Sequence, residues 1–408
     1  MTNATIPPPA AGPLAESDTH SVWELIKRRV RGGELGAWPV VIGLIVIWVV
    51  FQALNDRFLT AQNLSNLALQ ITAVGMISVG IVLVLLLGEI DLSVGSVAGV
   101  CAAALAVLSV RRGWSDVAAI IAALLLGAVI GFLQGTIFAK LGVPAFVVTL
   151  AGNLGWLGLM LYLLGSEGTI NVPTGTITDL MNTKLSQAAG WIVGLVVVAL
   201  YAVAAFTGRA RRASAGLPAA SLRSDLVRVI GLAAIVVVTV AVLNSWQGVP
   251  LGLLILVGLV ALLDLVLRKT RYGRSIFAVG GNIEAARRAG INVAAIQISV
   301  FTLCSTFAAL GGILLVSRGF SATQTTGASD VLLLAIAGAV IGGVSLFGGR
   351  GSPWGALLGA VVLGSISSGM LLIDVDSSVR YMITAAVLLA AVILDSVSRR
   401  GRRSSGRG

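Results

Sequence analysis

Residues 64–87 read LSNLALQITAVGMISVGIVLVLLL, a run of 24 residues without one charged side chain. At a rise of about 1.5 Å per residue, a helix of this length exceeds the roughly 30 Å of hydrocarbon in a bilayer. Similar runs recur along the 408-residue chain, of which 57% is hydrophobic and only 11% charged. This composition excludes a soluble enzyme or a nucleic-acid-binding protein and predicts an all-α polytopic membrane protein.

We count twelve apolar runs as predicted transmembrane helices. They are 37–54, 64–87, 92–110, 117–139, 143–165, 188–207, 229–244, 250–267, 293–316, 331–347, 353–373 and 379–397. The polar and glycine-rich residues at 244–250 predict a tight hairpin between the seventh and eighth runs. We therefore expect a transmembrane domain over 35–398, between a disordered basic tail at 1–34 and a basic tail at 399–408.

The positive charges indicate that both termini lie in the cytoplasm. In a twelve-helix arrangement that starts inside, 22 of the 28 lysines and arginines fall on the inner side, as the positive-inside rule requires. Arg111 and Arg112 are the exceptions within 64–116, so the charges fix the topology least in this segment.

The residues that usually build metal sites and active sites are scarce. Cys101 and Cys304 are the only cysteines, each inside an apolar run, and His20, the only histidine, falls in the polar leader. We therefore expect no disulfide, no metal site and no catalytic residue in this chain.

The first candidate segment, 88–96, reads GEIDLSVGS and places Glu89 and Asp91 between two apolar runs. Carboxylates at membrane depth are costly unless they meet a partner or water, which favours a broken helix beside a transport path. A short cytoplasmic turn, with Asp91 as the N-cap of the next helix, explains the charges equally well. The polar side chains that we expect along a path are Glu89, Asp91, Ser93, Gln70, Gln134 and Asn153.

The second candidate segment is the polar loop at 268–292, on the inner side. Within it, Asn282 is a good N-cap, Glu284 falls in a first turn, Arg287 and Arg288 suit a C-terminal turn, and Gly290 ends the helix. This order predicts a short exposed helix that docks a partner.

The third segment, 342–353, reads GGVSLFGGRGSP and predicts a tight turn. It lacks the lysine followed by serine or threonine that a phosphate-binding loop needs, and Lys269-Thr270 is preceded by Arg268 where such a loop needs glycine. If ATP drives transport, we expect another subunit to hydrolyse it.

Together these three segments resemble the motifs of permease subunits of bacterial ABC importers, in the ribose/xylose class of sugar permeases. Residues 280–291, GGNIEAARRAGI, are similar to the cytoplasmic coupling loop of that family, and 88–96 and 342–351 resemble two further motifs. The resemblance implies a ten-helix core like that of vitamin B12 importers, with two extra helices. The expected ATPase-coupling residues are Gly273, Arg274, Gly280, Gly281, Asn282, Glu284, Ala285, Ala286, Arg287 and Gly290.

The same resemblance implies the partners and the location. It implies a multi-pass protein of the bacterial inner membrane, paired with a second permease copy and with a cytoplasmic ATPase that uses ATP and Mg. An extracytoplasmic sugar-binding protein would dock mainly at 165–188. No cofactor is expected in this chain itself.

Two departures from the family pattern bear on the substrate and on the mechanism. Glu89 replaces a glycine that is usual before Ile-Asp-Leu-Ser. Between 165 and 268 this chain has three predicted helices where the shorter ribose permeases have one, and xylose-type permeases are similarly extended, which favours xylose or another pentose. An ion-coupled secondary transporter that uses Glu89 and Asp91 is the alternative. An integral-membrane enzyme is disfavoured, since paired acids are few and no histidine lies in an apolar run.

Overall fold

A computed structural model describes residues 38–217, 221–327 and 329–404, which belong to two units. Residues 37–395 form one unit. The other unit consists of 1–36 and 396–408, and of it only the end of the last helix is described. The predicted tail at 1–34 lies outside the described residues.

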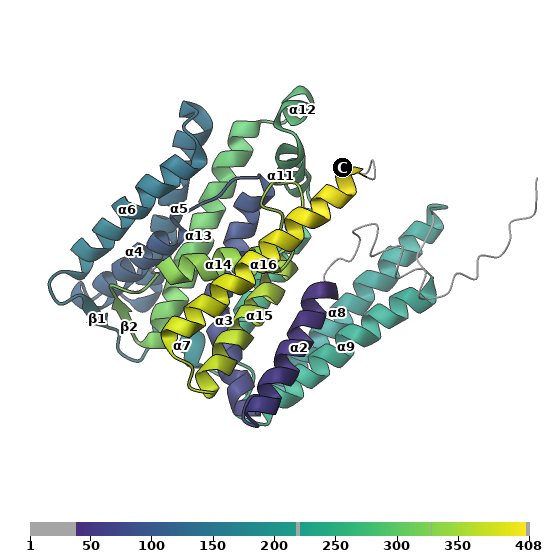
Figure 1. The fold of residues 1–408 in the computed structure, drawn as a ribbon, viewed down its shortest axis with the longest axis horizontal. Coiled ribbons are helices and arrows are strands. Elements are labelled where there is room, and N and C mark those ends of the chain that lie inside the picture. Colours follow the sequence, from purple (N-terminus) through teal and green to yellow (C-terminus); the bar gives the residue numbers. More distant parts are fainter. Residues whose placement is uncertain (1–37, 218–220, 328, 405–408) are drawn as a thin grey trace, which may run out of the picture. The chain divides into compact units, whose positions relative to one another are not determined.

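The described chain is mostly helical (Figure 1). Its helices are α2 (Trp38–Leu54), α3 (Ala61–Leu86), α4 (Val94–Ala106), α5 (Asp116–Leu141), α6 (Ala145–Leu164), α7 (Thr176–Asn182), α8 (Gln187–Ser214), α9 (Leu222–Asn244), α10 (Leu251–Lys269), α11 (Arg271–Gly281), α12 (Ile283–Arg288), α13 (Val293–Gly319), α14 (Ser329–Ile341), α15 (Pro353–Leu372) and α16 (Ser377–Ser404). A π-helical turn, η1 (Val107–Arg111), extends α4, and two short strands, β1 (Thr169–Asn171) and β2 (Ser321–Thr323), pair antiparallel.

Local sequence signals explain where many helices begin and end. Thr60, Ser115, Ser186 and Asn292 each accept a hydrogen bond from the N–H three residues ahead, at the starts of α3, α5, α8 and α13. Gly142 ends α5 in the left-handed conformation, with φ of 70°. These caps satisfy backbone groups that would otherwise be unpaired at helix ends in a membrane.

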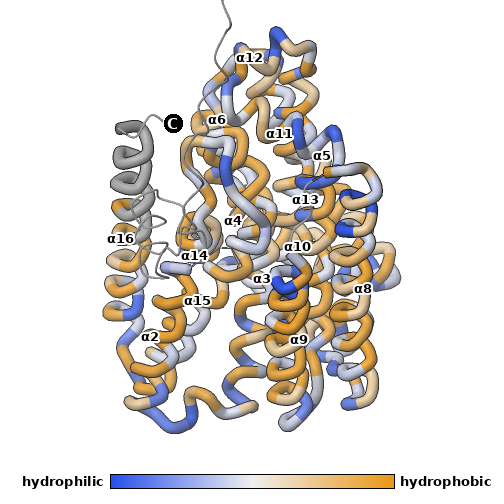
Figure 2. Tube along the Cα trace, turned by 90° about the vertical axis from the view of Figure 1, so that its right-hand side faces the viewer, coloured by the Kyte–Doolittle hydropathy of each residue, from blue (hydrophilic) through white to orange (hydrophobic). Residues whose placement is uncertain are grey.

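Nine of the described helices are long and apolar enough to cross a membrane, and they coincide with nine predicted runs. Figure 2 shows the apolar residues along these helices and hydrophilic residues in the loops and in α12. The other three runs correspond to shorter apolar helices, namely α2, α14 and the first part of α16. With 13 residues, α14 spans only about 20 Å. Twelve complete crossings therefore remain a prediction, whereas the all-α polytopic fold is confirmed.

The centre of the larger unit is built on α3 and α13. Helix α13 packs along α5, α3 and α4, and α3 also contacts α14 and α15. Glycines allow the closest approaches: a Cβ on Gly312 of α13 would lie 2.1 Å from the carbonyl oxygen of Ala98 on α4. Small residues at such crossings let backbones meet and gain van der Waals contact in the absence of water.

The helices α8 and α9 form a peripheral hairpin. They pack on each other, and α9 also touches α3. Gln187 and Asn244 exchange hydrogen bonds between side-chain amide and backbone carbonyl at one end, at 3.2 and 3.1 Å. Helix α9 ends at Asn244 and α10 begins at Leu251, with Gly248 at φ of 102° between them. The predicted tight hairpin of these two helices is only partly present, because the connection is short but α9 packs on α8 and not along α10.

Arg111, which the charge count left unexplained, closes the end of another helix. Its guanidinium donates to the carbonyl oxygens of Leu163 and Leu164, at 3.0 and 2.9 Å, in the last turn of α6. It also lies 3.5 Å from the Glu167 carboxylate. A cation at a helix C-terminus is favourable, so Arg111 stabilises the end of α6.

Candidate functional site

The segment between α3 and α4 is a break in helical structure with a buried acid. Asp91 is only 2% exposed, and its Oδ1 accepts hydrogen bonds from the Ser93 amide at 2.8 Å and from the Ser93 hydroxyl at 2.6 Å. Ser93, not Asp91, is the N-cap residue of α4. The expectation that Asp91 would be the N-cap is therefore wrong, because the carboxylate accepts from Ser93 itself and holds the residues just before the helix.

Side chains from three other helices surround this break. The side-chain amide nitrogen of Gln134, on α5, donates a hydrogen bond to the Ser93 hydroxyl oxygen at 3.0 Å. Gly152 of α6 makes room for this amide, because a Cβ there would lie 2.1 Å from the Gln134 Nε2 and 3.1 Å from the Trp156 indole nitrogen. The thiol of Cys304, on α13, neighbours the Asp91 carboxylate. We call Asp91, Ser93, Gln134 and Cys304 the polar cluster.

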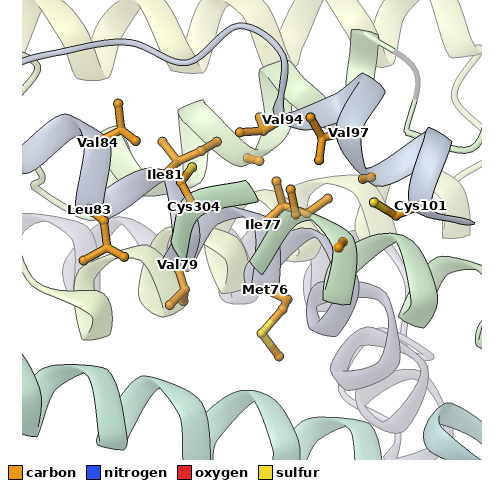
Figure 3. Close-up of a cluster of buried hydrophobic side chains, with 14 of the residues drawn as sticks. Met76, Ile77, Val79, Ile81, Leu83, Val84, Val94, Val97, Cys101 and Cys304 are labelled. Carbon is orange, nitrogen blue, oxygen red and sulfur yellow. The ribbon is translucent and has the colours of Figure 1, made fainter. Parts of the chain in front are cut away.

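The polar cluster lies well inside the helix bundle. Cys304 is eleven residues beyond Val293, the first residue of α13, which corresponds to about 16 Å along the helix axis. Figure 3 shows Cys304 among aliphatic side chains of α3 and α4, including Ile81 and Val94. A loop at the membrane surface would not bring Asp91 to this level, so the geometry favours the broken helix over the short surface turn.

Three polar atoms in or beside the polar cluster are buried without a hydrogen-bond partner among the described residues. They are Asp91 Oδ2, Trp156 Nε1 and Ser305 Oγ. An unpaired buried polar group costs about 1–3 kcal/mol, and an unpaired charge costs more. Polar groups kept at such a cost inside a membrane protein are typical of positions that act in transport.

The remaining path candidates do not join the polar cluster. Gln70 on α3 and Asn153 on α6 are half-buried, and no hydrogen bond among the described residues connects either to Asp91 or Gln134. Glu89 is half-buried between α3 and α4, where burial raises the pKa of its carboxyl. The structure thus brings together three of the six predicted path residues, Asp91, Ser93 and Gln134. It adds Cys304 and Trp156, which the sequence did not single out.

The predicted short helix at the second segment is confirmed as α12. The Asn282 side chain accepts from the Ala285 amide at 2.9 Å, and Gly290 follows the helix with φ of 79°. Residues 271–281, expected as plain loop, instead form the helix α11. Thr270 caps it by accepting from the Gly273 amide at 3.1 Å, and a Cβ on Gly273 would collide with the Leu267 backbone.

The predicted coupling residues divide into an inner and an outer set. Gly273 and Ala286 are buried and Gly280 is half-buried against the rest of the protein. The outer set is exposed and consists of Arg274, Gly281, Asn282, Glu284, Ala285, Arg287 and Gly290. Glu284 and Arg287 form an ion pair at 2.7 Å while both side chains stay about two-thirds exposed. The outer set therefore forms a folded, charged surface that is exposed to solvent.

The opposite end of α13 carries a small polar surface. There β2 pairs with β1, and an open pocket of about 240 Å³ is lined by Glu167, Gly168, Thr169, Thr323, Gln324 and Thr325. Helix α7 lies at the same end (Figure 1). Among the described residues, no group of three or more histidine, cysteine, aspartate or glutamate side chains is placed to hold a metal ion.

Comparison with known proteins identifies the family. Residues 63–392 match the family model described as branched-chain amino acid transport system / permease component. The xylose transport system permease protein of Haemophilus influenzae is 34% identical over 91% of this chain and 99% of that protein. Its counterpart in Escherichia coli K12 is 35% identical over 90% and 93%, and the ribose import permease protein of the same strain is 33% identical over 87% and 92%. No solved structure matches the chain.

These relatives cover nearly the whole chain and bear names of sugar permeases, so they do not favour the ion-coupled alternative. The motifs that carried the resemblance are the helix break after α3, the α11–α12 pair and the turn before α15, and all fall inside the matched region. The chain is a multi-pass membrane protein and belongs to the ribose/xylose class of sugar permeases of ABC transporters.

Proposed function

We propose that this chain is the permease subunit of an ATP-driven importer in the bacterial inner membrane, which moves a monosaccharide, namely xylose or another pentose. A separate ATPase subunit, using ATP and Mg, docks on α12 at the inner side. An extracytoplasmic binding protein delivers the sugar at the opposite end, and a second permease copy completes the pathway.

The observation that carries this proposal is the exposure of α12. A six-residue helix is too short to be stable alone, yet α12 is capped at its N-terminus and keeps nearly all its side chains in solvent. Only Ala286 is buried. A helix that is held in place but contributes so little to the core is suited to receive a partner.

The xylose preference rests on the names of the relatives and on the α8–α9 hairpin. The xylose permeases of two bacteria and a ribose permease have nearly the same sequence identity to this chain. Sequence identity alone therefore does not decide between xylose and ribose as the substrate. Uptake by proteoliposomes that contain the complete transporter, with labelled xylose and labelled ribose in competition, tests the preference. Equal uptake of the two sugars would contradict it.

One charge reversal at each end tests the two docking surfaces. Glu284 on α12 and Glu167 beside the polar pocket are both exposed acids paired with an arginine. We expect Glu284→Arg to lower the amount of ATPase that co-purifies with the permease in mild detergent, whereas Glu167→Arg leaves it unchanged. Conversely, Glu167→Arg should weaken stimulation of ATP hydrolysis by the sugar-loaded binding protein.

A wild-type permease that is well folded but recovers no ATPase would contradict the proposal. Sugar uptake that follows a proton or sodium gradient in the absence of ATP would do the same and would return attention to Glu89 and Asp91. Equal ATPase recovery with wild type and Glu284→Arg would instead contradict only the role of α12.

A further inference from the structure

The three segments singled out in the sequence meet at one point, where α3 ends. The carbonyl oxygen of Leu86, the last residue of α3, accepts a hydrogen bond from the Gly349 amide at 2.9 Å. A Cβ on Gly280 of α11 would lie 1.7 Å from that same oxygen. A Cβ on Gly348 would lie 2.5 Å from the Gly280 carbonyl oxygen and 2.9 Å from the Gly88 nitrogen. We call Gly88, Gly280 and Gly348 the glycine junction.

The glycine junction is a contact of backbone with backbone. The neighbours that a Cβ would meet at Gly280 and Gly348 are main-chain atoms of Leu86, Gly349, Gly280 and Gly88. Such atoms cannot move aside as the tip of a side chain does, since they belong to helices and to hydrogen-bonded turns. Gly88 and Gly348 also have φ of 83° and 82°, which favours glycine. The three segments are therefore fitted closely together.

The glycine junction lies between the two parts of the candidate site. On one side, Gly280 is in the last turn of α11, and α12 begins three residues later. On the other side, Gly88 precedes Asp91 by three residues in the segment that leads to the polar cluster. A displacement of α11 must therefore shift the start of this segment or break the junction, because no flexible side chain separates them.

We propose that the glycine junction is the positioning element through which α12 controls the polar cluster at Asp91. This inference rests on the proposed function, because it takes the partner on α12 to be the ATPase. When nucleotide binding moves α11 and α12, Gly280 carries the end of α3 and the 87–93 segment with it, and the surroundings of Asp91 change. Gly348 packs against both Gly280 and Gly88, so the movement of α11 is passed to the 87–93 segment.

Cys304 provides a native probe of this movement, because its thiol neighbours Asp91 and is fully buried. The chain contains only one other cysteine, Cys101. In a Cys101→Ala background, alkylation of Cys304 by a small membrane-permeant maleimide therefore reports opening around the polar cluster. For the complete transporter in detergent, we expect a non-hydrolysable ATP analogue to change the alkylation rate about tenfold, within the usual range of coupling between sites.

Matched glycine variants then test the junction itself. Gly280→Ala should abolish the nucleotide effect on Cys304, and Gly258→Ala should not, because a Cβ on Gly258 of α10 meets no atom within 4 Å. Gly348→Ala should also abolish the effect. Its control is Gly343→Ala, where φ is 87° but the added Cβ again meets nothing within 4 Å, so the backbone strain is matched and only the contact differs.

Every variant must elute as a single species and recover as much ATPase as the wild type, since the exposed face of α12 is unchanged. If Gly280→Ala or Gly348→Ala fails to fold, Gly88→Ala replaces it, because its Cβ would approach the Phe347 backbone only to 3.3 Å. Retention of the full nucleotide effect in the folded junction variants would overturn the inference. So would a wild-type alkylation rate that nucleotide does not change.

These outcomes are distinct from failure of the proposed function. If the wild type recovers no ATPase, the proposed function fails before Cys304 is measured. If the ATPase binds and the transporter imports sugar while the junction variants behave as wild type, the proposed function stands and only the role of the glycine junction is lost.

Discussion

The centre of this permease and its α8–α9 hairpin are built from the same apolar residues, but these residues are buried in the centre and exposed in the hairpin. Of the most apolar stretch of α3, 83% is buried, compared with 11% in α8 and in α9. Valine, leucine and isoleucine serve in both regions, because lipid and the protein interior are similarly apolar. Hydropathy therefore locates a helix in the membrane but does not say which helices form the core. The difference lies in small residues and in buried polar groups, and both can be tested.

The largest expected contrast concerns glycine. In the core, a Cβ on Gly312 of α13 would lie 2.1 Å from a backbone oxygen of α4, whereas a Cβ on Gly231 of α9 meets nothing within 4 Å. We expect Gly312→Ala to destabilise the protein by about 3 kcal/mol, because two helix backbones must separate. Gly231→Ala should stabilise it by about 0.5–1 kcal/mol, through helix propensity.

The apparent melting temperature in detergent checks both glycine changes. A fall for Gly312→Ala with no fall for Gly231→Ala is the expected result. Equal effects at the two positions would contradict the division into a closely packed centre and a loose hairpin.

The next contrast concerns buried acids. Asp91→Ala leaves the Ser93 amide and hydroxyl without their shared acceptor in the core, which should cost about 2 kcal/mol of stability. Asp225 of α9 is also buried, but its partner Arg209 lies 3.9 Å away and is about one-third exposed. We expect Asp225→Ala to cost about 1 kcal/mol or less.

Asp91→Asn is the control for this comparison. Its amide oxygen can accept the same two hydrogen bonds from Ser93, so most of the melting temperature should return. If Asp91→Asn is as unstable as Asp91→Ala, the carboxylate charge and not the hydrogen bonding holds the helix break.

A third prediction concerns α2, which is peripheral like the hairpin but is anchored by a side chain. The Trp48 indole nitrogen donates to the Ser365 hydroxyl of α15 at 2.9 Å. Trp48→Phe keeps an aromatic ring and removes this bond, so we expect a loss of about 1 kcal/mol. In the Ser365→Ala background, the same change should lower the melting temperature much less. An equal loss in both backgrounds would show that ring packing, not the hydrogen bond, anchors α2.

The sequence predicted the elements of this fold more fully than it predicted their assembly. Charge-free runs predicted the long helices, and Asn282 with Gly290 predicted α12. Helix α11 was not predicted, because its glycines and arginines are typical of a loop. In the structure, Gly273 has no side chain and so allows α11 to pack against the backbone of Leu267. Such a tertiary contact leaves no periodic signal in one sequence.

The candidate site shows the same limit. The sequence pointed to Asp91, Ser93 and Gln134 as polar residues in apolar surroundings. Nothing in it connected Asp91 with Cys304, more than two hundred residues later, or assigned Gly88, Gly280 and Gly348 to one contact. Each of the three motifs was recognised separately, and the 342–353 motif was interpreted as a turn and as a family motif without a structural partner. Its contact with the end of α3 depends on how α11, α14 and α15 pack.

The smallest effect that we predict is pH-dependent and concerns Glu89, at the edge of the core. Burial raises the pKa of its carboxyl above the ordinary value of 4.5, so the folded protein binds this proton more tightly than the unfolded chain does. The contribution of Glu89 to stability is therefore fully present below about pH 4.5 and is lost as pH rises through the folded pKa. Glu89→Gln should melt at a higher temperature than the wild type at pH 8, and this difference should vanish near pH 4. A variant that is less stable than the wild type at pH 8 would mean that the charge of Glu89 has a stabilising partner in the assembled transporter or in the membrane.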